Sequence, residues 1–128
     1  MKITIKTPEE IDVIRAGGKL LAQILADVRG AAVPGVSTWE LDEIAERLIR
    51  EAGGAPSFQG YRVQGISVPY PASLCTSIND EIVHGIPRHD RILCAGDIIG
   101  LDIGMWYPVN TTTNNQQATT NQKSDLLK

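Results

Sequence analysis

The sequence has few of the features that would assign it to a membrane, a nucleic acid or an oxidising compartment. No uninterrupted apolar stretch is long enough to span a bilayer, and the N-terminus lacks the apolar run of a secretion signal. The net charge is -3, so the chain has no electrostatic footprint for nucleic acid. Its only cysteines, Cys75 and Cys94, have no CxxC spacing. We therefore expect a cytoplasmic protein with two reduced thiols packed in or near strands, and neither a nucleic-acid nor a membrane partner.

The composition predicts one folded unit and a tail. With 128 residues, of which 42% are hydrophobic, the chain is long enough to bury the core of a single domain. After Tyr107 and Pro108 the composition changes abruptly: Thr, Asn and Gln dominate, and no aromatic residue, glycine or periodic apolar face follows. We predict a folded region over residues 1–108 and a disordered low-complexity polar tail over residues 109–128.

Two amphipathic helices are predicted in the first half of the chain. Thr7, Pro8 and Glu10 supply an N-cap, a first-turn proline and a capping-box partner, so the first helix should begin at Pro8 and run to about residue 30. Ser37 and Glu40 repeat the capping-box spacing before a second helix that should end at residue 53. The first helix carries one core-facing apolar stripe at helical spacing, formed by Ile11, Ile14, Leu21, Leu25 and Val28.

The segment that follows the helices is rich in Gly, Pro and aromatic residues, which is typical of an ordered loop. Its aromatic residues Phe58, Tyr61 and Tyr70 either line a pocket or cover the loop against the core. Beyond it, residues 74–78 and 82–86 are predicted to form a β-hairpin around a turn at residues 79–81. A longer strand over residues 98–105 completes the antiparallel sheet.

That last strand contains an aspartate in an unusual setting. Because side chains alternate along a strand, Gly100, Asp102 and Gly104 fall on one face and the large apolar residues fall on the other. An ionised carboxylate among apolar neighbours is costly unless a cation or hydrogen-bond donors satisfy it, so Asp102 is either a metal ligand or a carboxylate capped by backbone N–H groups or by an arginine. His84, in the predicted hairpin, is by itself more typical of a structural histidine than of a catalyst.

Four segments arrive in the order found in one enzyme family. They are KTPEEIDVIRAGG, PGVSTWELDEIAE, PYPASLCTSINDEIVHGIP and GDIIGLDIG. Together they resemble the N-terminal half of type I methionine aminopeptidases, which are M24 metallopeptidases. The resemblance implies an α+β fold, a partial pita-bread (creatinase/aminopeptidase-like) half-domain in which two N-terminal helices pack on an antiparallel sheet.

The resemblance also implies roles for individual residues. Asp102 corresponds to the first metal-ligating aspartate of a dinuclear site that takes Co, Mn, Fe or Zn. His84 corresponds to the catalytic histidine that hydrogen-bonds the substrate near the scissile amide. Tyr70 and Cys75, and by a less direct alignment Tyr61, correspond to residues that line the pocket for the methionine side chain.

The chain departs from the family pattern at the metal site. The family's bridging aspartate would fall at Thr113, whose neutral hydroxyl cannot replace a carboxylate. The remaining ligands, one His and two Glu, belong to the C-terminal half of the family's domain. We therefore expect a truncated or junction-altered methionine aminopeptidase that does not hold two metal ions stably and is inactive alone as a peptidase.

Three interpretations follow from this. By descent, the chain is a metalloaminopeptidase that removes the initiator methionine from nascent chains. Alternatively, it is a non-catalytic module that binds Met-initiated peptides or docks on a partner such as the ribosome. In the third interpretation, a second polypeptide supplies the missing half. Any isolated half would expose apolar sheet and an unpaired strand edge.

Overall fold

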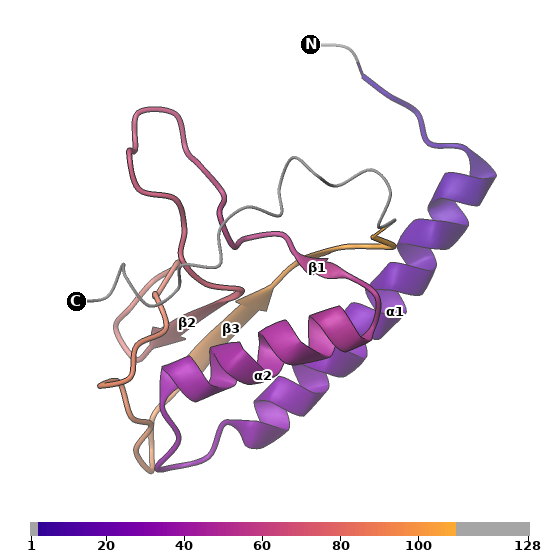
Figure 1. The fold of residues 1–128 in the computed structure, drawn as a ribbon. Helices are drawn as coiled ribbons and strands as arrows, with labels where there is room; N and C mark the ends of the chain where they lie inside the picture. The colour runs from indigo at the N-terminus through magenta and orange to yellow at the C-terminus, as the bar shows by residue number, and fades with distance from the viewer. Residues whose placement is uncertain (1–2, 110–128) are drawn as a thin grey trace.

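The computed structural model describes residues 3–109, which form a helical layer and a layer of strands (Figure 1). In the helical layer, α1 (Pro8–Ala31) packs against α2 (Thr38–Glu51). The second layer contains two antiparallel pairs: β1 (Ala55–Pro56) with β4 (Met105–Trp106), and β2 (Leu74–Ile78) with β3 (Ile99–Ile103). Strand β2 contacts α2 and strand β3 contacts α1, so the helices cover one face of this pair. The predicted α+β class, with two helices on an antiparallel sheet, is confirmed.

Both predicted helix starts are confirmed by their capping boxes. The Thr7 hydroxyl accepts a hydrogen bond from the Glu10 amide at 3.2 Å, and the Glu10 carboxylate accepts one from the Thr7 amide at 2.8 Å. Ser37 and Glu40 repeat the arrangement at 3.2 and 2.8 Å. Each box satisfies two of the amide groups that a helix leaves unpaired at its start. Helix α2 ends at Glu51, two residues before the predicted end, and Gly53, at a φ of 79°, follows the C-cap Ala52 in the left-handed conformation that stops the helix.

The buried core lies between α2, the C-terminal half of α1 and the strands. The prediction of one core-facing stripe along α1 is right only for that half: Val28 is buried, whereas Ile11 is 44% and Ile14 is 59% exposed. The N-terminal turns of α1 extend beyond the strands, which explains the difference (Figure 1). The residues of the core cluster are Ile24, Val28, Leu41, Ala45, Ile49, Leu74, Ile78 and Leu93.

The predicted β-hairpin is wrong in its second strand. Strand β2 pairs with β3 instead, and residues 82–86 are irregular. His84 has a φ of 58°, a left-handed conformation that interrupts an extended ladder. One main-chain bond remains on this side, from the Thr76 amide to the Gly85 carbonyl at 2.8 Å. A Cβ at Gly85 would collide with the Thr76 carbonyl, so this close approach requires glycine.

The strand predicted over residues 98–105 is divided into β3 and β4 at Gly104. Here the Ser57 amide donates to the Gly104 carbonyl at 3.1 Å, and a Cβ at Gly104 would collide with the Ser57 hydroxyl. The close approach of β1 therefore breaks the strand in two. Residues 110–128 lie outside the described residues, so the predicted polar tail is not observed, and neither is Thr113.

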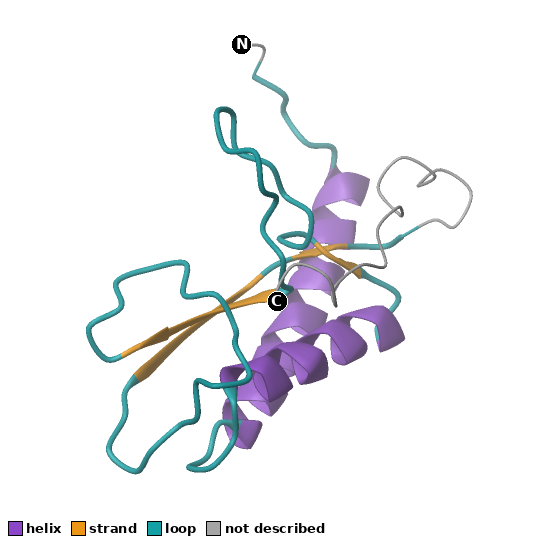
Figure 2. Cartoon of the chain, turned by 60° about the vertical axis from the view of Figure 1, so that its left-hand side comes forward, coloured by secondary structure: helices purple, strands orange, loops and turns teal. Residues whose placement is uncertain are grey.

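The loop between β1 and β2 projects away from the two helices (Figure 1), and Figure 2 shows how much of the chain outside the helices is loop. Its base is closed by two main-chain bonds: the Gly60 amide donates to the Tyr70 carbonyl at 2.8 Å, and the Tyr70 amide donates to the Tyr61 carbonyl at 2.9 Å. These bonds make the segment an ordered loop, as its composition predicted, and they place Tyr70 near the start of β2.

Candidate functional site

The register of β2 and β3 places Cys75 directly opposite Asp102. Burial alternates along β3 as predicted: Ile99, Leu101 and Ile103 are half-buried, and Gly100 and Asp102 are exposed. The Asp102 carboxylate has no hydrogen bond or ion pair to any residue between 3 and 109. Because the carboxylate is exposed, solvent stabilises its charge. Within the described residues it therefore needs neither a cation nor a hydrogen-bond donor.

Tyr70 stands at one end of this pair of strands. Its single O–H proton is shared between the carbonyls of Leu74 at 3.0 Å and Gly85 at 3.3 Å, and its ring meets Phe58 edge-on with the centroids 6.4 Å apart. Burial raises the pKa of Tyr70 far above its usual range, and the neighbouring Cys75 adds to the increase. The phenol is therefore neutral at physiological pH and is held by contacts on both its ring and its hydroxyl.

Cys75 is a buried thiol, 6% exposed, on β2. Burial raises its pKa, and the negative charges of Asp102 and Asp42 raise it further, while hydrogen bonding with Tyr70 opposes the shift. Cys75 thus remains a neutral thiol, which is apolar and polarisable rather than nucleophilic. Both cysteines are free, as predicted, but Cys94 is exposed, so the expectation that both thiols would be packed is wrong for Cys94.

The other two predicted site residues join the site through their main chains. Tyr61 accepts the Tyr70 amide hydrogen bond, yet its side chain points into solvent and the residue is 63% exposed. His84 precedes the Gly85 carbonyl that receives the Tyr70 hydroxyl, and it is also exposed. The structure therefore brings Tyr70, Cys75 and Asp102 together, and the side chains of Tyr61 and His84 are exposed to solvent.

One residue that positions the site was missed in the sequence. Asp42 on α2 is fully buried, and its carboxylate accepts hydrogen bonds from the amides of Ser73 at 2.7 Å and Leu74 at 2.8 Å. It thereby holds the start of β2, one residue before Cys75. Helical spacing in the sequence could have predicted that Asp42 is buried, because it falls on the same face of the helix as the buried Ala45 and Ile49.

The described residues do not form a complete metal site. Between residues 3 and 109, no group of three or more His, Cys, Asp or Glu side chains is arranged to hold a metal ion. Asp102 is one carboxylate, whereas divalent metal sites in proteins need three or more protein ligands or a set of oxygen ligands. These residues by themselves therefore do not fit a dinuclear centre.

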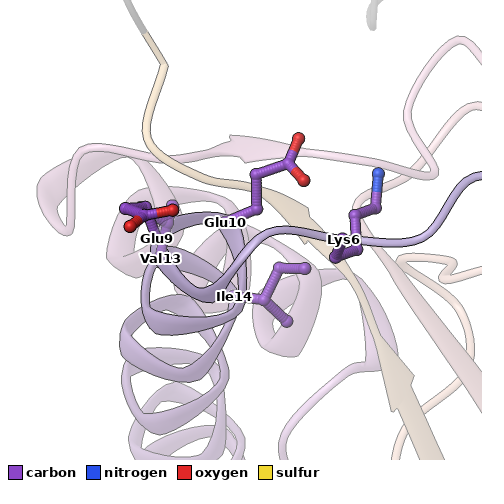
Figure 3. A pocket seen from close by; sticks show the side chains of 5 residues that line it. All are labelled: Lys6, Glu9, Glu10, Val13 and Ile14. Atoms are coloured by element: carbon purple, nitrogen blue, oxygen red, sulfur yellow. The ribbon is translucent and has the colours of Figure 1, made fainter.

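A surface hollow lies elsewhere, beside the N-terminal turns of α1 (Figure 3). It is lined by Lys6, Glu9, Glu10, Val13 and Ile14, none of which belongs to the candidate site. Within the part of the chain that the structure describes, no helix has the length and apolar character needed to cross a membrane.

The fold and the candidate site together define a class of protein. Metallopeptidase family M24 matches residues 12–117, and the chain belongs to this family. The relatives that it resembles are methionine aminopeptidases. It is 48% identical over 95 residues to methionine aminopeptidase 1 of Mycobacterium tuberculosis, and the match covers 74% of this chain and 34% of the relative. It is 40% identical over 107 residues to the methionine aminopeptidase of Aquifex aeolicus, covering 84% of this chain and 42% of the relative.

Solved structures give the same result. The methionine aminopeptidase of Thermotoga maritima superposes with a TM-score of 0.72 at 35% identity, covering 81% of this chain and 39% of the other. A methionine aminopeptidase from Streptococci superposes with a TM-score of 0.76 at 34% identity, covering 89% and 43%. The resemblance read from the four sequence segments is confirmed, as is the partial pita-bread fold. The chain spans less than half the length of these relatives.

Proposed function

We propose that this chain supplies the substrate-binding part of a metal-dependent methionine aminopeptidase, which removes methionine from the N-termini of nascent proteins. One observation carries the proposal: Cys75 lies opposite Asp102 across two paired strands, with the Tyr70 hydroxyl beside the thiol. This arrangement sets a neutral, polarisable surface next to an exposed carboxylate. An aminopeptidase specific for methionine needs a surface of that kind for the thioether and a ligand of that kind for its metal.

In this proposal the side chains have three roles. Tyr70 and Cys75 form the rigid wall that receives the methionine side chain, and Tyr61 closes over it from the projecting loop. His84 donates a hydrogen bond to the substrate near the scissile amide, and its exposed position leaves it accessible to a peptide. Asp42 is a positioning residue, since it fixes the main chain that carries Cys75.

Members of a metallopeptidase family use divalent metal ions, and Asp102 is the residue we assign to that role here. In the complete site the metal would supply an activated water and polarise the peptide carbonyl. Because residues 3–109 supply no further ligand cluster, we infer that this chain alone neither retains two ions nor cleaves peptides. We place the reaction in the cytoplasm, where nascent chains emerge from the ribosome, and assign the folded unit to residues 1–108.

Metal content and peptide binding test this function on the full chain. The protein is dialysed, reloaded with manganese or cobalt, and analysed for bound metal beside an Asp102→Ala variant. We expect less than one ion per chain and no release of methionine from a Met-Ala peptide. Two ions per chain, lost on Asp102→Ala, would show that the ligand set is complete and would overturn the inference of inactivity.

Binding of a methionine-initiated tripeptide is then measured by NMR without metal. We expect a saturable shift of the Cys75 and Tyr70 signals with Met-Ala-Ser and none with Ala-Ala-Ser, which lacks the thioether. Tyr70→Ala should abolish the shift, whereas Glu43→Ala, an exposed change on the same domain, should leave it intact. Equal responses to the two peptides would refute the methionine pocket.

A further inference from the structure

The projecting loop between β1 and β2 doubles back on itself at a tight turn (Figure 1). The Ile66 amide donates to the Val63 carbonyl at 3.0 Å, and Gly65, at the third position of this turn, has a φ of 87°. A left-handed glycine at the third position is typical of a type II turn, which splays the two arms that it joins. The arms therefore run in opposite directions without the bonds of a strand ladder.

The two arms are tied together at three levels. The turn closes the tip, and midway along the arms the Arg62 guanidinium donates to the Ser67 carbonyl at 3.3 Å. The bonds of the Gly60 and Tyr70 amides described above close the base. A segment held in this way is a preformed surface, so it loses little conformational entropy when a ligand binds to it.

The large apolar side chains of the loop share one face. Side chains alternate along each extended arm, and residues that oppose each other across a two-residue turn lie on the same side. The turn opposes residues 63 and 66, so residues 61 and 68 also lie on this side, and Arg62 and Ser67 lie on the other. All four residues on the first side are apolar or aromatic and between 50% and 63% exposed. We call them the loop face: Tyr61, Val63, Ile66 and Val68.

The surroundings of the loop face carry no negative charge in the sequence. Residues 55–79 contain no Asp or Glu, although the chain as a whole has a net charge of -3. A contiguous group of exposed apolar side chains is typical of a surface that binds a ligand or a partner. Because a basic partner would be recognised by acidic side chains, this composition favours an apolar ligand.

The loop face begins where the candidate site ends. Tyr61 belongs to the face through its side chain, and its carbonyl accepts the amide hydrogen bond of Tyr70, whose hydroxyl lies beside the Cys75 thiol. Each arm spans about 10 Å when extended, which is the length of about three residues of an extended peptide. A peptide whose methionine contacts Tyr70 and Cys75 therefore has its following residues within reach of the loop face.

We propose that the loop face is a subsite for apolar side chains at the third and fourth positions of the substrate. The chain then selects, among Met-initiated peptides, those whose following residues are hydrophobic. This inference rests on the proposed function for the position of the methionine. Its test varies the first residue and the later residues of the peptide separately, so failure of the methionine pocket and failure of the loop face give different results.

Four peptides test the subsite on the full 128-residue chain by NMR titration without metal. They combine Met or Ala at the first position with either Ala-Val-Leu-Ser or Ala-Ser-Thr-Ser after it. We expect Met-Ala-Val-Leu-Ser to bind at least about fivefold more tightly than Met-Ala-Ser-Thr-Ser, because two side chains leave water on the loop face. The methyl signals of Val63 and Ile66 should shift only with the Val-Leu peptides.

A double variant and a matched control locate the subsite. Val63→Ser combined with Ile66→Ser changes exposed residues, so the chain should unfold at the same urea concentration as the original protein. It should bind the two Met-initiated peptides with affinities within about twofold of each other. Ile14→Ser is the control, since Ile14 is 59% exposed on α1 and Ile66 is 57% exposed; it should keep the fivefold preference.

Several results would overturn the proposal. Equal binding of the two Met-initiated peptides would show that the loop face does not contact the substrate, whereas equal binding of Met- and Ala-initiated peptides would refute the methionine pocket instead. A preference that survives in the double variant would place the apolar contacts elsewhere. A homodimer by light scattering, or sedimentation with phosphatidylcholine vesicles, that the double variant abolishes would show that a second copy or a lipid surface occupies the face.

Discussion

Removal of the buried Asp42 carboxylate should be the most damaging polar substitution in this chain. Asp42 is fully buried and accepts two main-chain hydrogen bonds, at 2.7 Å from Ser73 and 2.8 Å from Leu74. A hydrogen bond to a charged group contributes about 1.5–3 kcal/mol, and a buried donor left unpaired costs about 1–3 kcal/mol. We therefore expect Asp42→Ala to lower the free energy of unfolding by about 3–5 kcal/mol.

Asp42→Asn should have a smaller effect, because the amide oxygen still accepts both bonds but carries no charge. We expect a loss of about 1–2 kcal/mol for this variant. Glu43→Ala is the matched control: the neighbouring residue on α2 is exposed, so the change should stay within about 0.5 kcal/mol. The free energies come from urea unfolding followed by the fluorescence of Trp39, which is buried at the start of α2.

Unfolding of Asp42→Ala and Glu43→Ala at the same urea concentration with the same slope would contradict this prediction. An Asp42→Asn variant as destabilised as Asp42→Ala would also contradict it, because the retained acceptor would then contribute nothing to stability. Because domains of this size are stable by only about 5–15 kcal/mol, an Asp42→Ala chain that is unfolded at zero urea would agree with the prediction.

Two further predictions use glycines and thiols. Gly85→Ala should destabilise the chain by about 1–3 kcal/mol, because a Cβ would collide with the main chain of β2. Gly18→Ala, in a helix with open space around the glycine, should stabilise the chain by about 0.5–1 kcal/mol. Equal effects of the two variants in urea unfolding would contradict both predictions. Iodoacetamide at neutral pH should label the exposed Cys94 quickly and the buried Cys75 slowly, because burial raises the pKa of Cys75. Asp102→Asn removes a negative charge that also raises this pKa, so it should speed labelling of Cys75 a few-fold, and an unchanged rate would show that the two residues do not interact.

The helices were determined by the sequence alone. Thr7 with Glu10, and Ser37 with Glu40, define capping boxes whose bonds form between residues three positions apart, so no distant part of the chain is needed to place the helix starts. The alternation of half-buried and exposed residues along β3 also follows from the local sequence, because the pleat of a strand fixes which side chains share a face. The four family segments were also readable, since each is a contiguous stretch of sequence.

Strand pairing, in contrast, was decided by tertiary structure. Residues 82–86 have the apolar composition of a strand, but the left-handed conformation of His84 and the close approach of Gly85 to β2 leave the ladder to β3, which lies further along the chain. Likewise, the spacing of apolar residues in α1 identified an apolar stripe along the helix. It did not show how much of that stripe would contact the strands. Ile11 and Ile14 stay exposed because the helix extends beyond the described sheet.

The candidate site shows the same division. The sequence identified Tyr70, Cys75 and Asp102 as residues of interest, but only the register of β2 and β3 set Cys75 opposite Asp102. Only burial raised the pKa values of the Tyr70 phenol and the Cys75 thiol, because a pKa responds to the surroundings of a group and not to its position in the chain. Asp42 acts across more than thirty residues of intervening sequence, a contact that helical spacing hints at and packing alone establishes.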